Sequence, residues 1–495
     1  MSQFIKIASW SSTQLLFAGL VLSLLVGIVG GILTESYALF GLPILFLGAF
    51  LVIVDFRKVF YLLLISLPLS TEVELPGGFG TDLPSELLTV LLMCVFWVYT
   101  LRHGKSFTIA FLKHPLTLLL LLHLGWIFIT MLNSELFIIS FKFFLAKIWY
   151  VSTFYFLAGY LLKTEKDIQT FFWCVFCAIL FTVIIILIRH AADDFSFEGV
   201  NFVLNPFYRN HVAYAAILVL FFPYLWYAPR WTTPYSWQWW LLIGSIFIFL
   251  AAIYLTYTRA AYVSLILAVG AYVIIKLRLM KMAIGLAMIV GLIGVIYVST
   301  NNKYLDFAPD YSKTITHNKF DNLLEATAKG EDISTMERVY RWVAGFQMVS
   351  DKPWMGFGPG NFYEFYKPYT VNSFETYVSD NPEHSGVHSY YLMTAIEQGI
   401  FGLVLFLLLC FYALLLGERV YHQTTSKAHK RLVLMAVLSL VIIDALLLIN
   451  DVVETDKVGS FFFIAMAILV NMDLSTRISI NHGDFKNHHD FKSKN

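Results

Sequence analysis

Residues 168–188 read IQTFFWCVFCAILFTVIIILI, an apolar run without a charged side chain. A helix needs about 20 such residues to cross the roughly 30 Å hydrocarbon core of a bilayer. Because lipid offers no hydrogen-bond partners, the backbone groups of the run must be satisfied within it, which predicts a helix. Runs of this kind recur along most of the chain.

The composition of the whole chain is that of a membrane protein. Of its 495 residues, 58% are hydrophobic and 14% are charged, and the mean hydropathy is +0.71. Soluble domains hold roughly 25% charged residues. Apolar runs at this density predict an all-α polytopic membrane protein with about 12–14 transmembrane helices and one large external loop. The net charge of +1 and the lack of a basic patch give no indication of nucleic acid binding.

The apolar runs define about fourteen predicted spans. They lie at 13–34, 37–54, 58–70, 85–101, 115–132, 137–163, 168–188, 211–228, 238–257, 260–276, 282–299, 388–416, 431–449 and 458–472. The third is short enough to be re-entrant. The first lacks a small-residue cleavage site, which favours a retained helix over a signal peptide.

Lysine and arginine are distributed asymmetrically between the loops. With the N-terminus in the cytoplasm, most of them face inward, and the short outer loops hold only Arg189, Arg209, Arg259 and Lys457. The positive-inside rule therefore predicts cytoplasmic N- and C-termini. The resulting parts are transmembrane helices over 1–299, an external (periplasmic) loop over 300–387, C-terminal transmembrane helices over 388–472 and a cytoplasmic tail over 473–495, which we expect to be disordered.

Two of the outer arginines interrupt apolar sequence. Arg259 lies between two predicted helices with almost no loop, and Arg209 lies at another outer helix end. A cation at this depth is costly unless it is paired or reaches the interface. Each could simply anchor a helix end. Alternatively, their planar donor forks could hold a phosphate or diphosphate in an outward-facing cleft. Lys142 and Lys147 could extend this site or reach lipid head groups.

The external loop is predicted to contain a helix that ends before Pro353. Apolar residues between Met336 and Phe346 recur at helical spacing, so one face of this helix should pack on the bundle or the membrane surface. Arg338 and Arg341 point away from that face and could be plain solvated charges. The glycines that follow, at 356, 358 and 360, permit tight turns, but no strand and helix frame them as a phosphate loop.

The chain re-enters the membrane at His388. A histidine at a membrane edge can be a polar cap or a packing residue, or a base that titrates near neutral pH. His384 is a second candidate. Cys174 and Cys177 have CxxC spacing, but they lie in mid-membrane without a second pair or a histidine, which is against a metal or redox role. The sequence shows no metal-ligand cluster, acidic dyad or nucleophile elbow.

Three motifs in order resemble the O-antigen ligase and polymerase superfamily of bacterial membrane glycan enzymes. They are Arg338-x-x-x-Trp342, the run DKPWMGFGPGNF over 351–362, and His388-Ser-Tyr-Tyr-Leu392 followed by Gly399 and Gly402. Arg259, in a Thr-Arg-Ala context, is similar to a further family pattern, with Val263 at the position where leucine is common.

The resemblance implies a GT-C-like helical fold in the bacterial inner membrane. It implies a glycosyltransferase that needs no metal or cofactor and inverts the linkage. The donor would be a glycan on undecaprenyl diphosphate, and the acceptor a glycan or lipid A-core, among membrane lipids at the outer face. His388 would be the catalytic base, and Arg209, Arg259 and Arg338 would bind the diphosphate. Lipopolysaccharide ligation, repeat-unit polymerisation, attachment to protein and assembly of a secreted polysaccharide all stay open.

A transporter or flippase of lipid-linked or anionic solutes is the alternative class. Such a protein would be expected to carry charge in mid-membrane, broken helices or internal symmetry, and no convincing repeat is present in the sequence. The order of the glycine-rich run, His388 and Gly399 favours the enzyme. A purely structural protein would not need arginines at outer helix ends.

Overall fold

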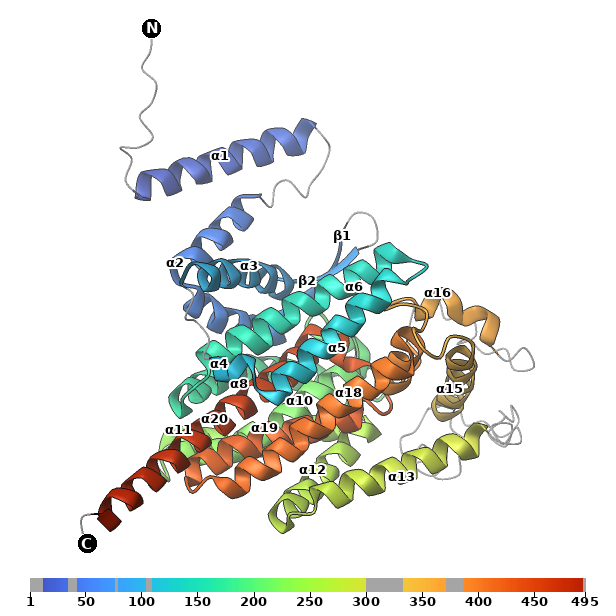
Figure 1. Ribbon diagram of the computed structural model, residues 1–495. Coiled ribbons are helices and arrows are strands. Elements are labelled where there is room, and N and C mark those ends of the chain that lie inside the picture. Colours follow the sequence, from blue (N-terminus) through green and yellow to red (C-terminus); the bar gives the residue numbers. More distant parts are fainter. Residues whose placement is uncertain are drawn as a thin grey trace.

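The computed structural model describes residues 12–33, 42–75, 79–103, 109–299, 333–370 and 386–492. Figure 1 shows them as a bundle of long helices with a small group of elements at one end. Within these residues, ten helices are long and apolar enough to cross a membrane. The prediction of an all-α polytopic membrane protein is therefore confirmed.

The long helices follow the predicted apolar runs closely. The ten candidate spans are α3 (Ser85–His103), α5 (Pro115–Leu132), α6 (Phe137–Tyr150) continued by η4 (Val151–Leu157) and α7 (Ala158–Leu161), α8 (Glu165–Ala192), α10 (His211–Tyr227) continued by η5 (Ala228–Trp231), α11 (Trp237–Tyr254), α12 (Arg259–Leu277), α13 (Met280–Ser299), α18 (Tyr390–Gln423) and α20 (Asp456–Lys492). Three further long helices are α1 (Ser12–Leu33), α2 (Leu42–Ser66) and α19 (Lys427–Leu446).

The core of the bundle lies along α10, α19 and α20, which pack on one another. In the most apolar window of each helix, 83% of α10 and 89% of α20 are buried, against 6% of α13 at the periphery. Aromatic rings fill the interior: the Phe221 ring stacks on Phe172 with centroids 5.5 Å apart and meets Phe461 at 6.0 Å. Helices that are apolar on all sides can be buried in this way.

The N-terminal part differs from the sequence prediction. The runs at 37–54 and 58–70 form mostly one helix, α2, which kinks at Asp55 (φ −153°, ψ 80°). A short antiparallel hairpin follows, β1 (Thr71–Leu75) and β2 (Phe79–Leu83). The hydroxyl groups of Ser70 and Ser85, on either side of the hairpin, both donate to Asp456 Oδ2, at 3.1 and 2.7 Å. The hairpin was missed because its sequence is short and does not alternate clearly.

The C-terminal part also differs. Helix α20 continues past residue 472 to Lys492, where a disordered tail was expected. Helix α18 contains a break at Gly399, whose backbone is non-helical (φ 72°, ψ 178°). Between α19 and α20, the turn η8 (Val452–Glu454) crosses the same end of the bundle as the start of α18.

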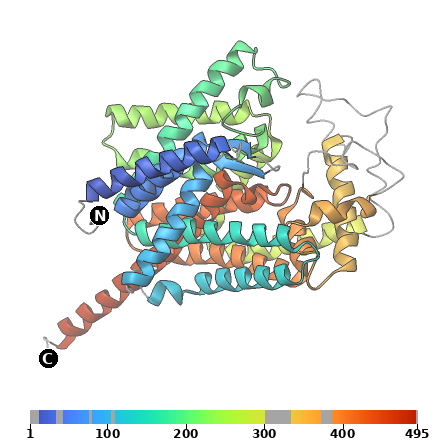
Figure 2. The same ribbon diagram turned by 90° about the horizontal axis from the view of Figure 1, so that it is seen from above.

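The described part of the loop that was predicted to be external packs on α18. It contains α15 (Ile333–Asp351), α16 (Phe362–Tyr366) and η7 (Lys367–Tyr369). The predicted helix before Pro353 is thereby confirmed. A small separate core joins α15, α16 and the start of α18: Ala344, Met348, Phe357, Phe362, Tyr366, Val387 and Ile396. Figure 2 shows α15 and α16 at one end of the bundle and the C-terminal end of α20 at the other.

Short elements complete the chain. They are η3 (Leu67–Leu69), α4 (Ile109–Leu112) and α9 (Val200–Val203).

Candidate functional site

Helix α15 holds the segment that contains His388. Arg341 is buried, with 3% of its surface exposed, and its guanidinium donates a hydrogen bond to the Gly386 carbonyl at 2.6 Å. The Trp342 indole N–H points to the His388 carbonyl at 3.4 Å. Arg341 is therefore not the solvated charge that the sequence allowed. The sequence did not indicate this burial, because Gly386, which accepts the hydrogen bond from Arg341, lies 45 residues further along the chain.

The backbone around His388 is tightly constrained. His388 has φ 56°, a region that residues other than glycine rarely occupy. Ser389 caps α18, and the Tyr390 N–H donates to the carbonyl groups of Leu447 at 2.9 Å and Asn450 at 3.2 Å. Backbone conformations of this kind cost about 1–3 kcal/mol and cluster at functional sites. The fold thus fixes the backbone that carries His388 at the point where α15, α18 and the α19–α20 connection meet.

The environment of His388 keeps its imidazole uncharged. Burial, followed by the charge of Arg341 and then that of Arg338, lowers the pKa of His388 to about 3. Removal from water and nearby cations both disfavour the protonated form. At neutral pH the ring therefore has a nitrogen that can accept a proton. Of the three arginines predicted to bind the diphosphate, Arg338 lies within electrostatic reach of His388.

Arg209 lies within electrostatic reach of Asp451, which is in the same region. Burial raises the pKa of Asp451, and the charges of Arg341 and Arg209 act on it in the opposite direction. Asp451 also lies against Gly386: a Cβ atom at that glycine would be 2.1 Å from Asp451 Oδ2. Asp451 was missed in the sequence because a single acidic residue after an apolar run carries no motif.

Arg259 lies at the neighbouring helix end. It is the first residue of α12, and the hydroxyl of the preceding Thr258 lies 3.5 Å from the carbonyl of His211, the first residue of α10. The charge of Arg338 acts on the His211 side chain. The charge of Arg338 thus acts on a histidine whose backbone carbonyl lies beside Thr258, the residue before Arg259. His384 lies outside the described residues.

The glycine-rich run clamps the break in α18. Gly356, Gly358 and Gly360 all have positive φ, at 67°, 100° and 79°. The Phe357 and Gly358 N–H groups donate to the carbonyls of Ile396 and Glu397, each at 2.9 Å, and the Ile400 N–H donates to Pro353 at 2.8 Å. These bonds satisfy the backbone groups that the break at Gly399 leaves without helical partners. The run is a structural clamp in this fold rather than a phosphate loop.

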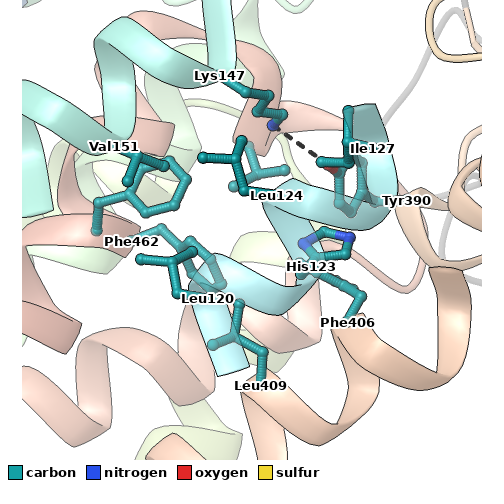
Figure 3. A pocket seen from close by; sticks show the side chains of 12 residues that line it. Leu120, His123, Leu124, Ile127, Lys147, Val151, Tyr390, Phe406, Leu409 and Phe462 are labelled. Atoms are coloured by element: carbon teal, nitrogen blue, oxygen red, sulfur yellow. Dashed lines mark hydrogen bonds between the residues drawn. The ribbon is translucent and has the colours of Figure 1, made fainter. Parts of the chain in front are cut away.

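A buried polar group lies beneath the start of α18. Lys147 Nζ is 2.6 Å from Glu454 Oε1 and donates to the Tyr390 hydroxyl at 3.3 Å. Figure 3 shows Lys147, Tyr390 and His123 around a cavity of about 20 Å³ that is otherwise apolar. A cavity of this size holds about one water molecule. Lys147 therefore neither reaches lipid head groups nor joins the outer cations, whereas Lys142 is exposed.

Comparison with known families matches a part of the chain that contains most of these site residues. Residues 244–407 match a protein-family model described as O-antigen ligase. The matched segment starts within α11 and ends within α18, so it includes Arg259, α15, the glycine-rich clamp and His388. The search of curated proteins gave no match.

Proposed function

We propose that this chain, which belongs to the O-antigen ligase and polymerase superfamily, transfers a glycan from undecaprenyl diphosphate to an acceptor hydroxyl at the outer face of the bacterial inner membrane. Membership supports a membrane glycan ligase or polymerase in general terms. The donor, the inverting course without a metal, the cytoplasmic termini and the roles of single residues are our proposal.

One observation carries the proposal. His388, in a turn with positive φ, lies within electrostatic reach of Arg338 and Arg341, where the loop meets the bundle. A base and an anion site must lie side by side in a reaction that removes a proton from an acceptor and releases a diphosphate. Arg259 and Arg209, at adjoining helix ends, would complete the grip on the two phosphates.

The reaction divides between these groups. The acceptor oxygen forms a bond to the anomeric carbon while the bond from that carbon to the diphosphate oxygen breaks. Undecaprenyl diphosphate leaves with the bonding electrons, and its growing negative charge is stabilised by the arginines. The acceptor proton passes to a ring nitrogen of His388. Attack opposite to the leaving group inverts the anomeric centre.

Donor binding would also adjust the base. With a pKa of about 3, His388 is neutral but a weak proton acceptor. A diphosphate placed on Arg338 and Arg341 would offset the two charges that lower this pKa. The base would thus be strengthened when the donor is present, which limits proton uptake in its absence.

A transporter remains the second candidate because of the break in α18, a feature of transporter sites. In transporters, the backbone groups freed by such a break face the solute. Here the break at Gly399 is covered by the glycine-rich clamp, whose N–H groups take up the free carbonyls. Lys147, which is buried, is likewise held by an ion pair with Glu454. These contacts favour the enzyme.

The test is a transfer assay with the purified full-length chain. Undecaprenyl-diphosphate glycan and a panel of acceptors (lipid A-core, the repeat unit, a peptide) would be supplied on one side of proteoliposomes. We expect a new glycosidic bond and one undecaprenyl diphosphate released for each bond formed. Passage of the intact lipid-linked glycan across the bilayer, with no new bond on any acceptor, would reject the enzyme and support the transporter.

A further inference from the structure

A second cavity lies at the end of the bundle opposite His388. Helices α12 and α18 both begin near the candidate site, and their C-terminal ends, with the start of α13, enclose a cavity of about 480 Å³. Its lining includes the cations Arg278, Lys281 and Arg419 and the side chains of Tyr412 and Leu415. A cavity of this volume is within the range of ligand sites.

Two hydrogen bonds beside this cavity join α18 to the end of α12 and the start of α13. Arg278 ends α12 in a left-handed conformation (φ 60°, ψ 37°), and α13 starts two residues later. The Met280 N–H donates to Glu418 Oε1 at 3.0 Å, and the His422 ring N–H donates to the Ile275 carbonyl at 2.7 Å. Only 6% of the apolar window of α13 is buried, so most of the apolar surface of this helix is left to face lipid.

The charges around the cavity favour the binding of an anion. Arg278, Lys281 and Arg419 are cations, whereas Glu418 is the one carboxylate among the lining residues. Arg419 forms an ion pair with Asp473 at 3.3 Å, and Asp473 forms a second ion pair with Arg477 at 2.7 Å. A smaller cavity of about 220 Å³, lined in part by Arg419 and Arg477, adjoins the first and extends the positive surface.

We propose that this crevice binds an anionic phospholipid, with the phosphate headgroup at Arg278 and Lys281 and an acyl chain along Tyr412 and Leu415 between α13 and α18. The cations stand where apolar helices end, which is the depth of a headgroup, and Tyr412, Leu415 and Leu416 give the same cavity an apolar part. Basic pockets between membrane helices recognise such headgroups through charge. The site is separate from the glycan-transfer site, and the inference does not rest on the proposed function.

Lipid binding to the purified full-length chain tests the inference. Native mass spectrometry would compare phosphatidylglycerol with phosphatidylethanolamine and phosphatidylcholine of the same acyl chains. We expect phosphatidylglycerol to be retained preferentially, and Arg278→Ala and Lys281→Ala each to weaken it about fivefold, near the value of one cation at an anionic surface. Both side chains are exposed, so the variants should fold. Lys427→Ala, an exposed cation outside the cavity, is the matched control.

Three results would overturn the inference. Equal retention of anionic and zwitterionic lipids would remove the role of charge. An equal loss in Lys427→Ala would show diffuse attraction rather than a site. Full displacement of phosphatidylglycerol by inorganic phosphate, with the Arg278 and Lys281 dependence kept, would make the crevice a free-anion site instead of a lipid site.

Discussion

Replacing Gly399 by alanine should separate the glycine-rich clamp from α18. Gly399 has φ 72° and ψ 178°, a conformation that is essentially restricted to glycine and costs other residues about 1–3 kcal/mol. An alanine Cβ would also lie 2.1 Å from the Trp354 carbonyl oxygen and 2.9 Å from the Met355 nitrogen. Both obstacles are backbone, so no side-chain rotation can relieve the contact, and the turn must move.

The free-energy cost of Gly399→Ala follows from the hydrogen bonds that a shift of the turn would break. Three backbone hydrogen bonds join the clamp to the broken segment of α18, and each contributes about 1 kcal/mol. Together with the backbone strain, the full cost is about 4–6 kcal/mol. Phe357 in the clamp and Val387 beside His388 share one small core. A shift of about 1 Å in that core would misalign His388 and Arg338 and lower transfer by about 10²-fold.

The assay is glycan transfer by purified Gly399→Ala, with thermal unfolding measured on the same sample. The matched control is Gly270→Ala in α12, the helix that carries Arg259, where an added Cβ meets nothing within 4 Å. We expect the control to keep both activity and unfolding temperature. Gly399→Ala with normal transfer and normal stability would refute the clamp argument.

Three further predictions concern orientation, the anion grip and pH. Ser379→Cys should react with an impermeant thiol reagent in intact spheroplasts and Ser493→Cys should not; the reverse pattern would invert the topology. Arg259→Lys should lower transfer by about 10²-fold because it keeps the charge but loses the donor fork, and Arg209→Ala should act in the same direction; near-normal transfer by Arg259→Lys would remove the two-pronged grip. The acid limb of kcat should lie at higher pH than that of kcat/KM, because the donor raises the pKa of His388 from its free value of about 3; coincident limbs would contradict this.

The membrane class and the helices were predictable because each apolar run carries its own signal. Burying the backbone in lipid leaves one local solution, so α8 or α12 could be placed without knowledge of its neighbours. The prediction failed where charge interrupts a run: Asp55 divides α2 with a kink, not with a loop. The motif around the glycines was visible, but its role was not, since Gly399 contacts Trp354, which lies 45 residues before it.

The site was predictable only for residues whose position is anomalous. Arg259 and Arg209 stand out because cations are rare at outer helix ends, and His388 stands out at the edge of a long loop. Arg341 and Asp451 look ordinary in sequence, and their proximity depends on the packing of α15 beside the α19–α20 connection. Lys147 could have been a further outer cation by its sequence, but the fold places Glu454 at 2.6 Å from it.

The central claim is that His388 takes the acceptor proton while the arginines hold the donor. The most direct measurement compares glycan transfer and binding of undecaprenyl-diphosphate glycan in purified wild type and His388→Ala. We expect transfer to fall by roughly 10²–10⁴-fold, with donor affinity retained because the arginines are unchanged. A His388→Ala protein that transfers glycan at the wild-type rate would contradict the account.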